Sequence, residues 1–117
     1  MNTVAKRNIT YRALLASDDK ALVTLLPTIM APAGYDVTAV ARGCYDESAA
    51  DQFDILIIDG DPHHTFGQGL PAVVAVAPTD IIAAYDKGVD LVISKPLRAK
   101  VFMVKIRAIL RRYGIEI

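Results

Sequence analysis

The stretch Phe53-Asp54-Ile55-Leu56-Ile57-Ile58-Asp59 places an unbroken run of large apolar residues between two acids, and Gly60 follows it. A short, continuously apolar run is typical of a strand that is buried on both faces of a parallel sheet. Neighbouring parallel strands need a crossover of about a dozen residues or more, which is usually a helix. The sequence on either side is therefore expected to alternate strands with helices.

Further apolar runs on both sides of this strand fit the alternation. Strands are predicted at residues 11–16, 35–41, 71–77 and 89–94, and helices at residues 20–31, 42–51, 79–87 and 98–113. Pro27 lies inside the first helix and removes a backbone donor, so a kinked or shortened helix is expected there. Asp18 or Asp19 is expected to cap that helix. The pattern predicts an α/β domain with a parallel sheet and helices on both faces.

Composition excludes several classes of protein. The chain has 117 residues, 53% of them hydrophobic, and its 13 basic and 13 acidic side chains give a formal net charge of zero. The apolar content excludes a disordered chain, and no apolar run reaches the roughly 18 residues that a membrane span needs. The start of the chain is polar and basic rather than a secretory signal, so a cytoplasmic location is expected. Cys44 is the sole cysteine, which excludes an internal disulfide.

Polar residues follow the predicted strands at the edge where parallel sheets usually bind ligands. They are Ser17, Asp18 and Asp19 after the first strand, Asp59 and Asp61 at the end of the third, and Lys95 after the fifth. Clustered carboxylates repel one another unless a cation lies among them, and oxygen ligands of this kind suit Mg²⁺. A lysine beside them would neutralise a phosphoryl group. These are the parts of an aspartyl-phosphate site.

At these residues the sequence resembles the receiver domain of two-component response regulators, from Tyr11 to Arg112. Residues 13–19, 53–59 and 87–96 carry the resemblance, and the last segment is similar to the family signature Gly-Ala-Asp-Asp-Tyr-x-x-Lys-Pro. Residues 105–112 resemble the end of the receiver in OmpR/PhoB-type transcription factors. The resemblance implies a flavodoxin-like fold with a five-stranded parallel sheet in the order 2-1-3-4-5.

The resemblance also assigns roles to residues. Asp59 matches the phosphoacceptor, Lys95 the phosphate-binding lysine, and Asp18 one acid of the metal-binding pair. Asp61 lies where the family offers a backbone carbonyl to the metal, and a shifted register would make the acidic pair Asp18 and Asp19. Mg²⁺ is the implied cofactor, and a histidine kinase and a C-terminal DNA-binding effector domain in a longer parent chain are the implied partners.

The sequence departs from the family at the residues that relay phosphorylation to the surface. Ser17 replaces an acid of the metal-binding pair. The switch hydroxyl after the fourth strand falls on Val76 or Ala77, with Thr79 the nearest substitute, and Val92 replaces the aromatic switch residue. The sequence therefore favours an atypical or pseudo-receiver that is not an enzyme and associates with partners without the usual phosphorylation switch.

The chain is also short in its middle. Only 11 residues lie between Asp59 and Pro71, which is too few for a parallel crossover with a full helix. The third helix of the usual fold is therefore predicted to be missing or reduced to a turn. The sheet face that it would leave bare needs cover from residues 60–70, from another subunit or from a partner.

The last helix and the strand before it suggest an interface. In OmpR/PhoB-type receivers the fourth helix, fifth strand and fifth helix form a two-fold dimer through charged pairs, and Asp90, Lys105, Arg111 and Arg112 match some of those positions. A homodimer is therefore expected, while solvated charges on a helix are the competing interpretation. The basic residues lack aromatic neighbours and a groove-reading helix, so direct binding of nucleic acid is not expected.

Two alternatives to the pseudo-receiver stay open. One is conventional Mg²⁺-dependent phosphorylation of Asp59 by a histidine kinase, which would drive dimerisation. The other is a small-ligand sensor that uses the cropped pocket and the pair His63 and His64, although no third ligand stands at a recognisable spacing for a metal. Residues 1–10 are expected to form an N-terminal extension, 11–113 the receiver-like domain, and 114–117 the C-terminal end or the start of a linker.

Overall fold

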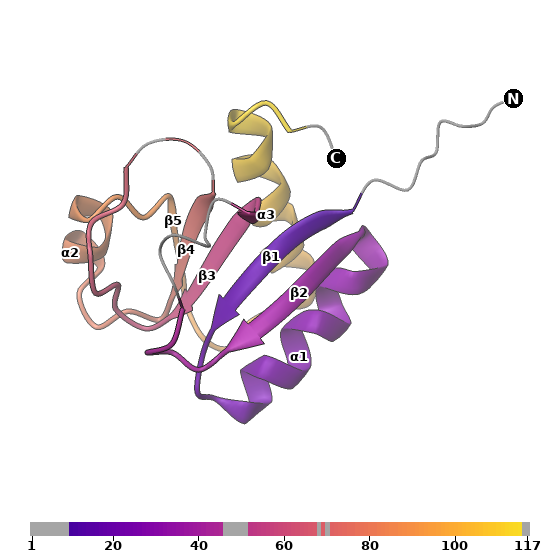
Figure 1. The fold of residues 1–117 in the computed structure, drawn as a ribbon, viewed down its shortest axis with the longest axis horizontal. Helices are drawn as coiled ribbons and strands as arrows, with labels where there is room; N and C mark the ends of the chain where they lie inside the picture. Colours follow the sequence, from indigo (N-terminus) through magenta and orange to yellow (C-terminus); the bar gives the residue numbers. More distant parts are fainter. Residues whose placement is uncertain (1–9, 46–51, 68, 70, 116–117) are drawn as a thin grey trace, which may run out of the picture.

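Five parallel strands form the sheet, in the order β2-β1-β3-β4-β5 (Figure 1). The computed structural model describes residues 10–45, 52–67, 69 and 71–115. The strands are β1 (Tyr11–Ala16), β2 (Tyr35–Val40), β3 (Ile55–Asp59), β4 (Ala72–Val76) and β5 (Leu91–Ile93), and the helices are α1 (Lys20–Met30), the 3-10 turn η2 (Ala31–Ala33), α2 (Ile81–Asp86) and α3 (Ala99–Arg112). This confirms the predicted fold class. No helix within the described residues combines the length and the apolar character needed to cross a membrane.

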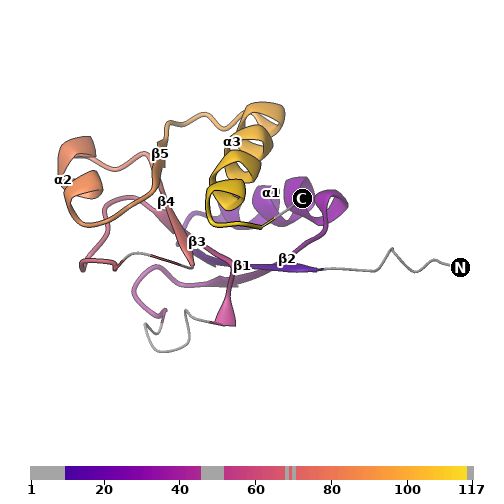
Figure 2. The ribbon, with the colours of Figure 1, turned by 90° about the horizontal axis from the view of Figure 1, so that it is seen from above.

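Alternate residues of the central strands enter two cores, one on each face of the sheet. Leu15 and Ile57 pack on the face covered by α1 and α3, which lie side by side in Figure 2. Leu56 and Ile58 pack on the other face, together with Ala84 of α2. The apolar run of β3 is therefore buried on both faces, as its sequence predicts, and no residue from Ile55 to Ile58 is more than 1% exposed.

Helix α1 begins after Asp19, whose side chain accepts a hydrogen bond from the backbone N–H of Ala21. Of the two effects expected of Pro27, a kink or a shorter helix, the shortening is wrong, because α1 runs on to Met30. Leu22 and Met30, on either side of the proline, are both buried against the sheet. Packing on both sides of Pro27 holds the helix together despite the missing backbone donor.

The helix predicted at residues 42–51 is not found in its described part. Residues 42–45 form a turn, closed by the N–H of Cys44 donating to the carbonyl of Ala41 at 2.9 Å. The N–H of Arg42 donates to the Asp18 carboxylate at 3.0 Å. Up to Tyr45 the backbone after β2 is thus tied to the loop after β1 and is not helical. Residues 46–51 lie outside the described residues.

The predicted loss of the third helix is confirmed for the described residues between β3 and β4, none of which is helical. Phe66 from this connection packs on the adjoining core, and its N–H donates to the carbonyl of Lys87 at 2.7 Å. Tyr45 and Phe53 pack against the same core. The connection itself therefore helps to cover the sheet face, which is the first of the three kinds of cover expected.

Candidate functional site

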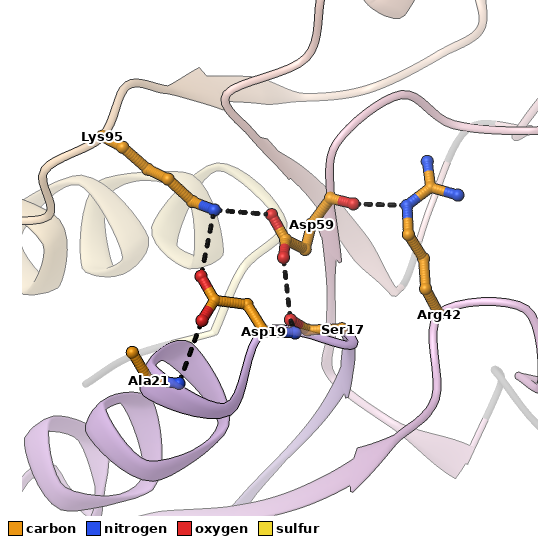
Figure 3. Close-up of polar contacts among 6 residues, drawn as sticks. All are labelled: Ser17, Asp19, Ala21, Arg42, Asp59 and Lys95. Carbon is orange, nitrogen blue, oxygen red and sulfur yellow. Dashed lines mark hydrogen bonds and ion pairs between the residues drawn. The ribbon is translucent and has the colours of Figure 1, made fainter.

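The carboxyl ends of β1, β3 and β5 bring three charged side chains together (Figure 3). The Nζ of Lys95 lies 3.1 Å from Oδ1 of Asp59 and 3.3 Å from Oδ2 of Asp19. The hydroxyl of Ser17 donates to Oδ2 of Asp59 at 2.8 Å. Both carboxylate oxygens of Asp59 are therefore bonded within the chain.

The register of the sheet explains why these residues meet. Ala16 pairs with Ile58, so Ser17 and Asp59 follow side by side at the same edge. The hydroxyl of Ser17 is buried at the foot of the site, and the residue is 4% exposed. The side chain of Asp59 is 15% exposed, whereas that of Lys95 is 40% exposed. The side chain of Asp59 is thus mostly buried, and that of Lys95 beside it is more exposed.

The contacts of Lys95 shift two proton equilibria. The bond to the Asp59 carboxylate is the main reason that the pKa of Lys95 is raised. The pKa of Asp19 is lowered, first by the N–H of Ala21 and then by Lys95. Both side chains are largely exposed, so water and salt screen the attraction and its contribution to stability is small.

The resemblance assigns the Asp18 carboxylate and the Asp61 carbonyl to a metal, and both acid side chains have other partners. Oδ1 of Asp18 accepts the N–H of Arg42, as described above. The carboxylate of Asp61 accepts the hydroxyl of Thr79 at 2.7 Å and its N–H at 2.9 Å. The hydroxyl bond is the main reason that the pKa of Asp61 is lowered. Thr79, the nearest substitute for the switch hydroxyl, therefore donates to Asp61 and not to Asp59.

Arg42 enters the site, although the sequence predicts a helix at this position and assigns the residue no role. Its Nε donates to the carbonyl oxygen of Asp59 at 2.5 Å, and its Nη2 donates to the carbonyl oxygen of Asp61 (Figure 3 shows the first bond). Its Nη1 contacts Nε2 of His63. The signal that pointed to it was present in the sequence: Arg42 closely follows a predicted strand, so it belongs to the same edge as the acids.

Several of the oxygens that a magnesium ion would use already have partners within the chain. The Asp61 carbonyl accepts Arg42, a serine replaces one acid, and Asp18 accepts a backbone N–H. No group of three or more His, Cys, Asp or Glu side chains that could hold a metal ion occurs in the part of the chain that the structure describes. As arranged, these residues do not fit the coordination that Mg²⁺ requires.

The two histidines do not converge on a common ligand site. His63 contacts Arg42. His64 lies 3.0 Å from the hydroxyl of Tyr45 and packs against the ring of Phe66, with the ring centroids 4.6 Å apart. These contacts hold the β3–β4 connection against the rest of the chain, so the two histidines have a structural role.

The predicted interface residues also separate into two kinds. Asp90 is used inside the chain, because its carboxylate accepts the N–H of Val73 at 2.7 Å and the hydroxyl of Tyr113 at 2.5 Å. Burial and this bond raise the pKa of Tyr113 to about 12. Lys105, Arg111 and Arg112 are exposed on α3. Large exposed apolar side chains lie on the two helices that flank the edge strand β5, namely Ile81, Ile82 and Tyr85 on α2 and Val101 and Val104 on α3.

No family model matches the chain. The chain is 26% identical to the transcriptional regulatory protein GltR of Pseudomonas aeruginosa, in an alignment that covers 85% of this chain and 48% of that protein. It thus spans about half the length of this curated relative.

Solved structures give the same result for the fold. A CheY-like response regulator receiver domain protein from Methanospirillum hungatei JF-1 matches with a TM-score of 0.72 and 17% identity, over 91% of this chain and 98% of that one. The chemotaxis response regulator CheY4 of Vibrio cholerae matches with a TM-score of 0.70 and 15% identity, over 86% and 99% of the two chains. The receiver domain of a sensor histidine kinase from P. aeruginosa PAO1, solved with magnesium in its active-site cleft, matches with a TM-score of 0.64 and 19% identity, over 90% and 98%. The chain therefore has the receiver fold.

Proposed function

We propose that the chain is an atypical receiver domain of two-component signalling, which acts by association with partners rather than by turning over a substrate. The observation that carries the proposal is the bond from Ser17 to Asp59, which puts a neutral hydroxyl where the family has an acid. Val76, Ala77 and Val92 offer neither the hydroxyl nor the aromatic ring of the family's relay. A phosphoryl group on Asp59 would therefore lack the usual route to the surface.

The association surface that we propose is the edge formed by α2, β5 and α3. It carries exposed apolar side chains, with Ile82 75% and Val104 58% exposed, and a basic border of Lys105, Arg111 and Arg112. Apolar residues surrounded by charges are typical of protein interfaces. Asp90 supports this edge from inside, through its bonds to Val73 and Tyr113. The proposed partner at this edge is a second copy of the chain.

The parent protein that we propose is a longer cytoplasmic transcription regulator with a C-terminal DNA-binding effector domain. The support is the match to GltR, a transcriptional regulatory protein of which the aligned region is about half. The second candidate function is phosphorylation of Asp59 by a histidine kinase in a Mg²⁺-dependent reaction. It is favoured by the closeness of Lys95, which the resemblance assigns to phosphate binding, to Asp59, the residue that it assigns as phosphoacceptor.

Phosphorylation and oligomeric state separate the two candidates. The protein is incubated with acetyl phosphate, or with beryllofluoride, in the presence of Mg²⁺, and its mass and oligomeric state are followed by mass spectrometry and light scattering. The atypical receiver should form a dimer whose dissociation constant changes by less than about twofold, well under 1 kcal/mol. A phosphoryl adduct that is lost in Asp59→Asn but retained in Asp36→Asn, together with a shift toward dimer, would establish the second candidate instead.

The proposed surface is tested by Val104→Asp. A charge in the apolar part of the interface should weaken the dimer at least about tenfold, or roughly 1.4 kcal/mol. Leu25→Asp is the matched control, because Leu25 lies on α1, beside the loop of residues 95–97 rather than on α2, β5 or α3, and is 41% exposed. Equal loss of dimer in both variants, or in neither, contradicts the proposed surface.

A further inference from the structure

We propose that the guanidinium of Arg42 takes the place of a divalent cation at the strand-end site, so that the site is held together without metal. The inference rests on the proposed receiver-derived site and deepens it by identifying the cation that the site uses. Measurements of metal binding test this inference, whereas measurements of phosphorylation and oligomeric state test the proposed function. Either one can therefore be contradicted while the other stands.

The first argument is the choice of oxygens. Arg42 donates from Nη2 to the carbonyl of Asp61, the oxygen that the family resemblance assigns to the metal. It donates from Nε to the carbonyl of Asp59 at 2.5 Å. A guanidinium is a permanent cation with five donors in a fixed plane, so it can bind both carbonyl oxygens in one geometry. A hydrated metal ion would compete for the same oxygen lone pairs.

The second argument is the space that Gly60 leaves. Gly60 lies between the two carbonyl oxygens in sequence and has φ +100°. A Cβ at this position would lie 3.3 Å from both Nε and Nη2 of Arg42. The absence of a side chain therefore leaves room for the guanidinium beside the backbone of residue 60. A glycine at position 60 is thus suited to the close approach of the Arg42 side chain.

The third argument is the backbone of Arg42, which engages a different acid. Its N–H donates to Oδ1 of Asp18 at 3.0 Å. Asp18 is the acid of the metal-binding pair that the sequence retains, since Ser17 replaces the other. Arg42 thus bonds oxygens at the ends of both β1 and β3 that would otherwise be available to a metal. Its main chain bonds the first and its side chain bonds the second. Arg42 thereby ties the loop after β2 to the ends of β1 and β3.

The fourth argument is charge. Lys95 is already 3.1 Å from Asp59 on the solvent side of the site. With Arg42 on the other side, a divalent ion near Asp59 would meet two positive charges. The chain's own cations therefore offset the carboxylates, and the gain from adding a metal is small.

The experiment compares Mn²⁺ and Mg²⁺ binding by the whole chain and by Arg42→Gln, using electron paramagnetic resonance for Mn²⁺ and calorimetry for both ions. Glutamine keeps a polar side chain but removes the charge and frees the Asp61 carbonyl. The variant is expected to bind the ions at least about tenfold more tightly than the unmodified chain. Adding Asp59→Asn to Arg42→Gln should abolish the gain. Arg12→Gln is the matched control, because Arg12 lies over the ring of Phe53 and has no contact with the site in the described residues.

Thermal unfolding gives a second measurement. Millimolar Mg²⁺ should raise the Tm of Arg42→Gln and leave that of the unmodified chain unchanged, because an ion that binds only the folded state stabilises it. Ion binding by the unmodified chain that is as tight as in the variant and is lost in Asp59→Asn would overturn the proposal. The same holds if a folded Arg42→Gln gains no affinity. If Arg42→Gln does not fold, amide spectra decide: saturable shifts of Gly60 and Asp61 in the unmodified chain on addition of Mg²⁺ overturn the proposal, and their absence supports it.

Discussion

Lys95 reaches across the sheet edge to Asp59, with its Nζ 3.1 Å from the nearer carboxylate oxygen, and it also lies 3.3 Å from the carboxylate of Asp19. One ammonium group thus links the ends of three strands that are distant in sequence. Lys95 and Asp19 are each 40% exposed. Exposed ion pairs contribute little to the free energy of unfolding. The main effect of the contact is therefore on the pKa of Lys95 rather than on the free energy of unfolding.

Asp59→Asn should lower the pKa of Lys95 toward its ordinary value of 10.5, because the carboxylate that raises it is removed. The measurement is an NMR titration of the Lys95 Cε and Nζ resonances. A raised pKa in the folded state means that any stability from this contact is fully present below pH 10.5 and is lost as the pH rises through the folded-state value. Asp36→Asn, on exposed β2 surface, is the control, and an unchanged Lys95 titration in Asp59→Asn would contradict the contact.

Thr79→Val should raise the pKa of Asp61 toward 3.8, because the hydroxyl bond is the main cause of its lowering. A lowered pKa contributes stability above pH 3.8, which is lost as the pH falls through the folded-state value. On acidification, the Thr79→Val variant should therefore begin to unfold at a higher pH than the unmodified chain. The titration is followed at the Asp61 Cγ resonance by NMR.

Thr28→Val provides the comparison for this prediction. The Thr28 hydroxyl donates to the carbonyl of Thr24 on α1, at 3.1 Å, so the same chemical change is made away from Asp61. If the two variants shift the Asp61 titration equally, the Thr79 hydroxyl is not the cause.

The parts of the site that the sequence could predict are those determined by strand register alone. The apolar run ending at Asp59 and the lysine at 95 fall at one edge in any parallel sheet of this order, so their meeting follows from the topology. The contacts of Arg42 and Asp18 depend on how the loop after β2 turns, and no periodicity encodes that. The sequence therefore identified the acids and Lys95 but missed the arginine that lies among them.

The same distinction explains Asp90. Its position before β5 matched an interface residue, yet its carboxylate faces Val73 and Tyr113 inside the chain. A one-dimensional pattern gives the element and the charge, whereas the direction of a short side chain depends on neighbours that are distant in sequence. Tyr113, which completes this contact, is 23 residues away along the chain.

Tyr35→Phe should stabilise the protein by up to about 1 kcal/mol. The Tyr35 hydroxyl is buried and has no hydrogen-bond partner within the described residues, so it loses its water without compensation. Burial also raises its pKa to about 12 from the ordinary value of 10.0. The unfolded chain ionises first as the pH rises, so stability is lost between those two values, and phenylalanine should remove that loss.

Urea denaturation, followed by circular dichroism at neutral pH and at pH above about 10, measures this difference. Tyr113→Phe should have the opposite sign at neutral pH and cost about 1 kcal/mol, because the Tyr113 hydroxyl has a partner in Asp90. Destabilisation by Tyr35→Phe as large as that by Tyr113→Phe would mean that the Tyr35 hydroxyl has a favourable partner.

Gly88→Ala should be the most destabilising of the substitutions considered. Gly88 follows α2 with φ +96°, and an added Cβ would overlap the carbonyl oxygen of Phe66. Gly114 follows α3 with φ +84°, and no atom of the described residues lies within 4 Å of the Cβ that alanine would add. Both variants carry the backbone cost of a positive φ, about 1–2 kcal/mol.

Only Gly88→Ala must also displace the connection that covers the sheet face, so its cost in urea denaturation should exceed that of Gly114→Ala by about 1–3 kcal/mol. Displacement of Phe66 would expose the apolar face beside β3 and β4, so Gly88→Ala should also bind a hydrophobic dye such as ANS where Gly114→Ala does not. Equal free energies of unfolding in the two variants would mean that the β3–β4 connection can move away from the added Cβ without loss of stability. The cover supplied by the β3–β4 connection would then contribute nothing to the stability of a receiver fold that lacks its third helix.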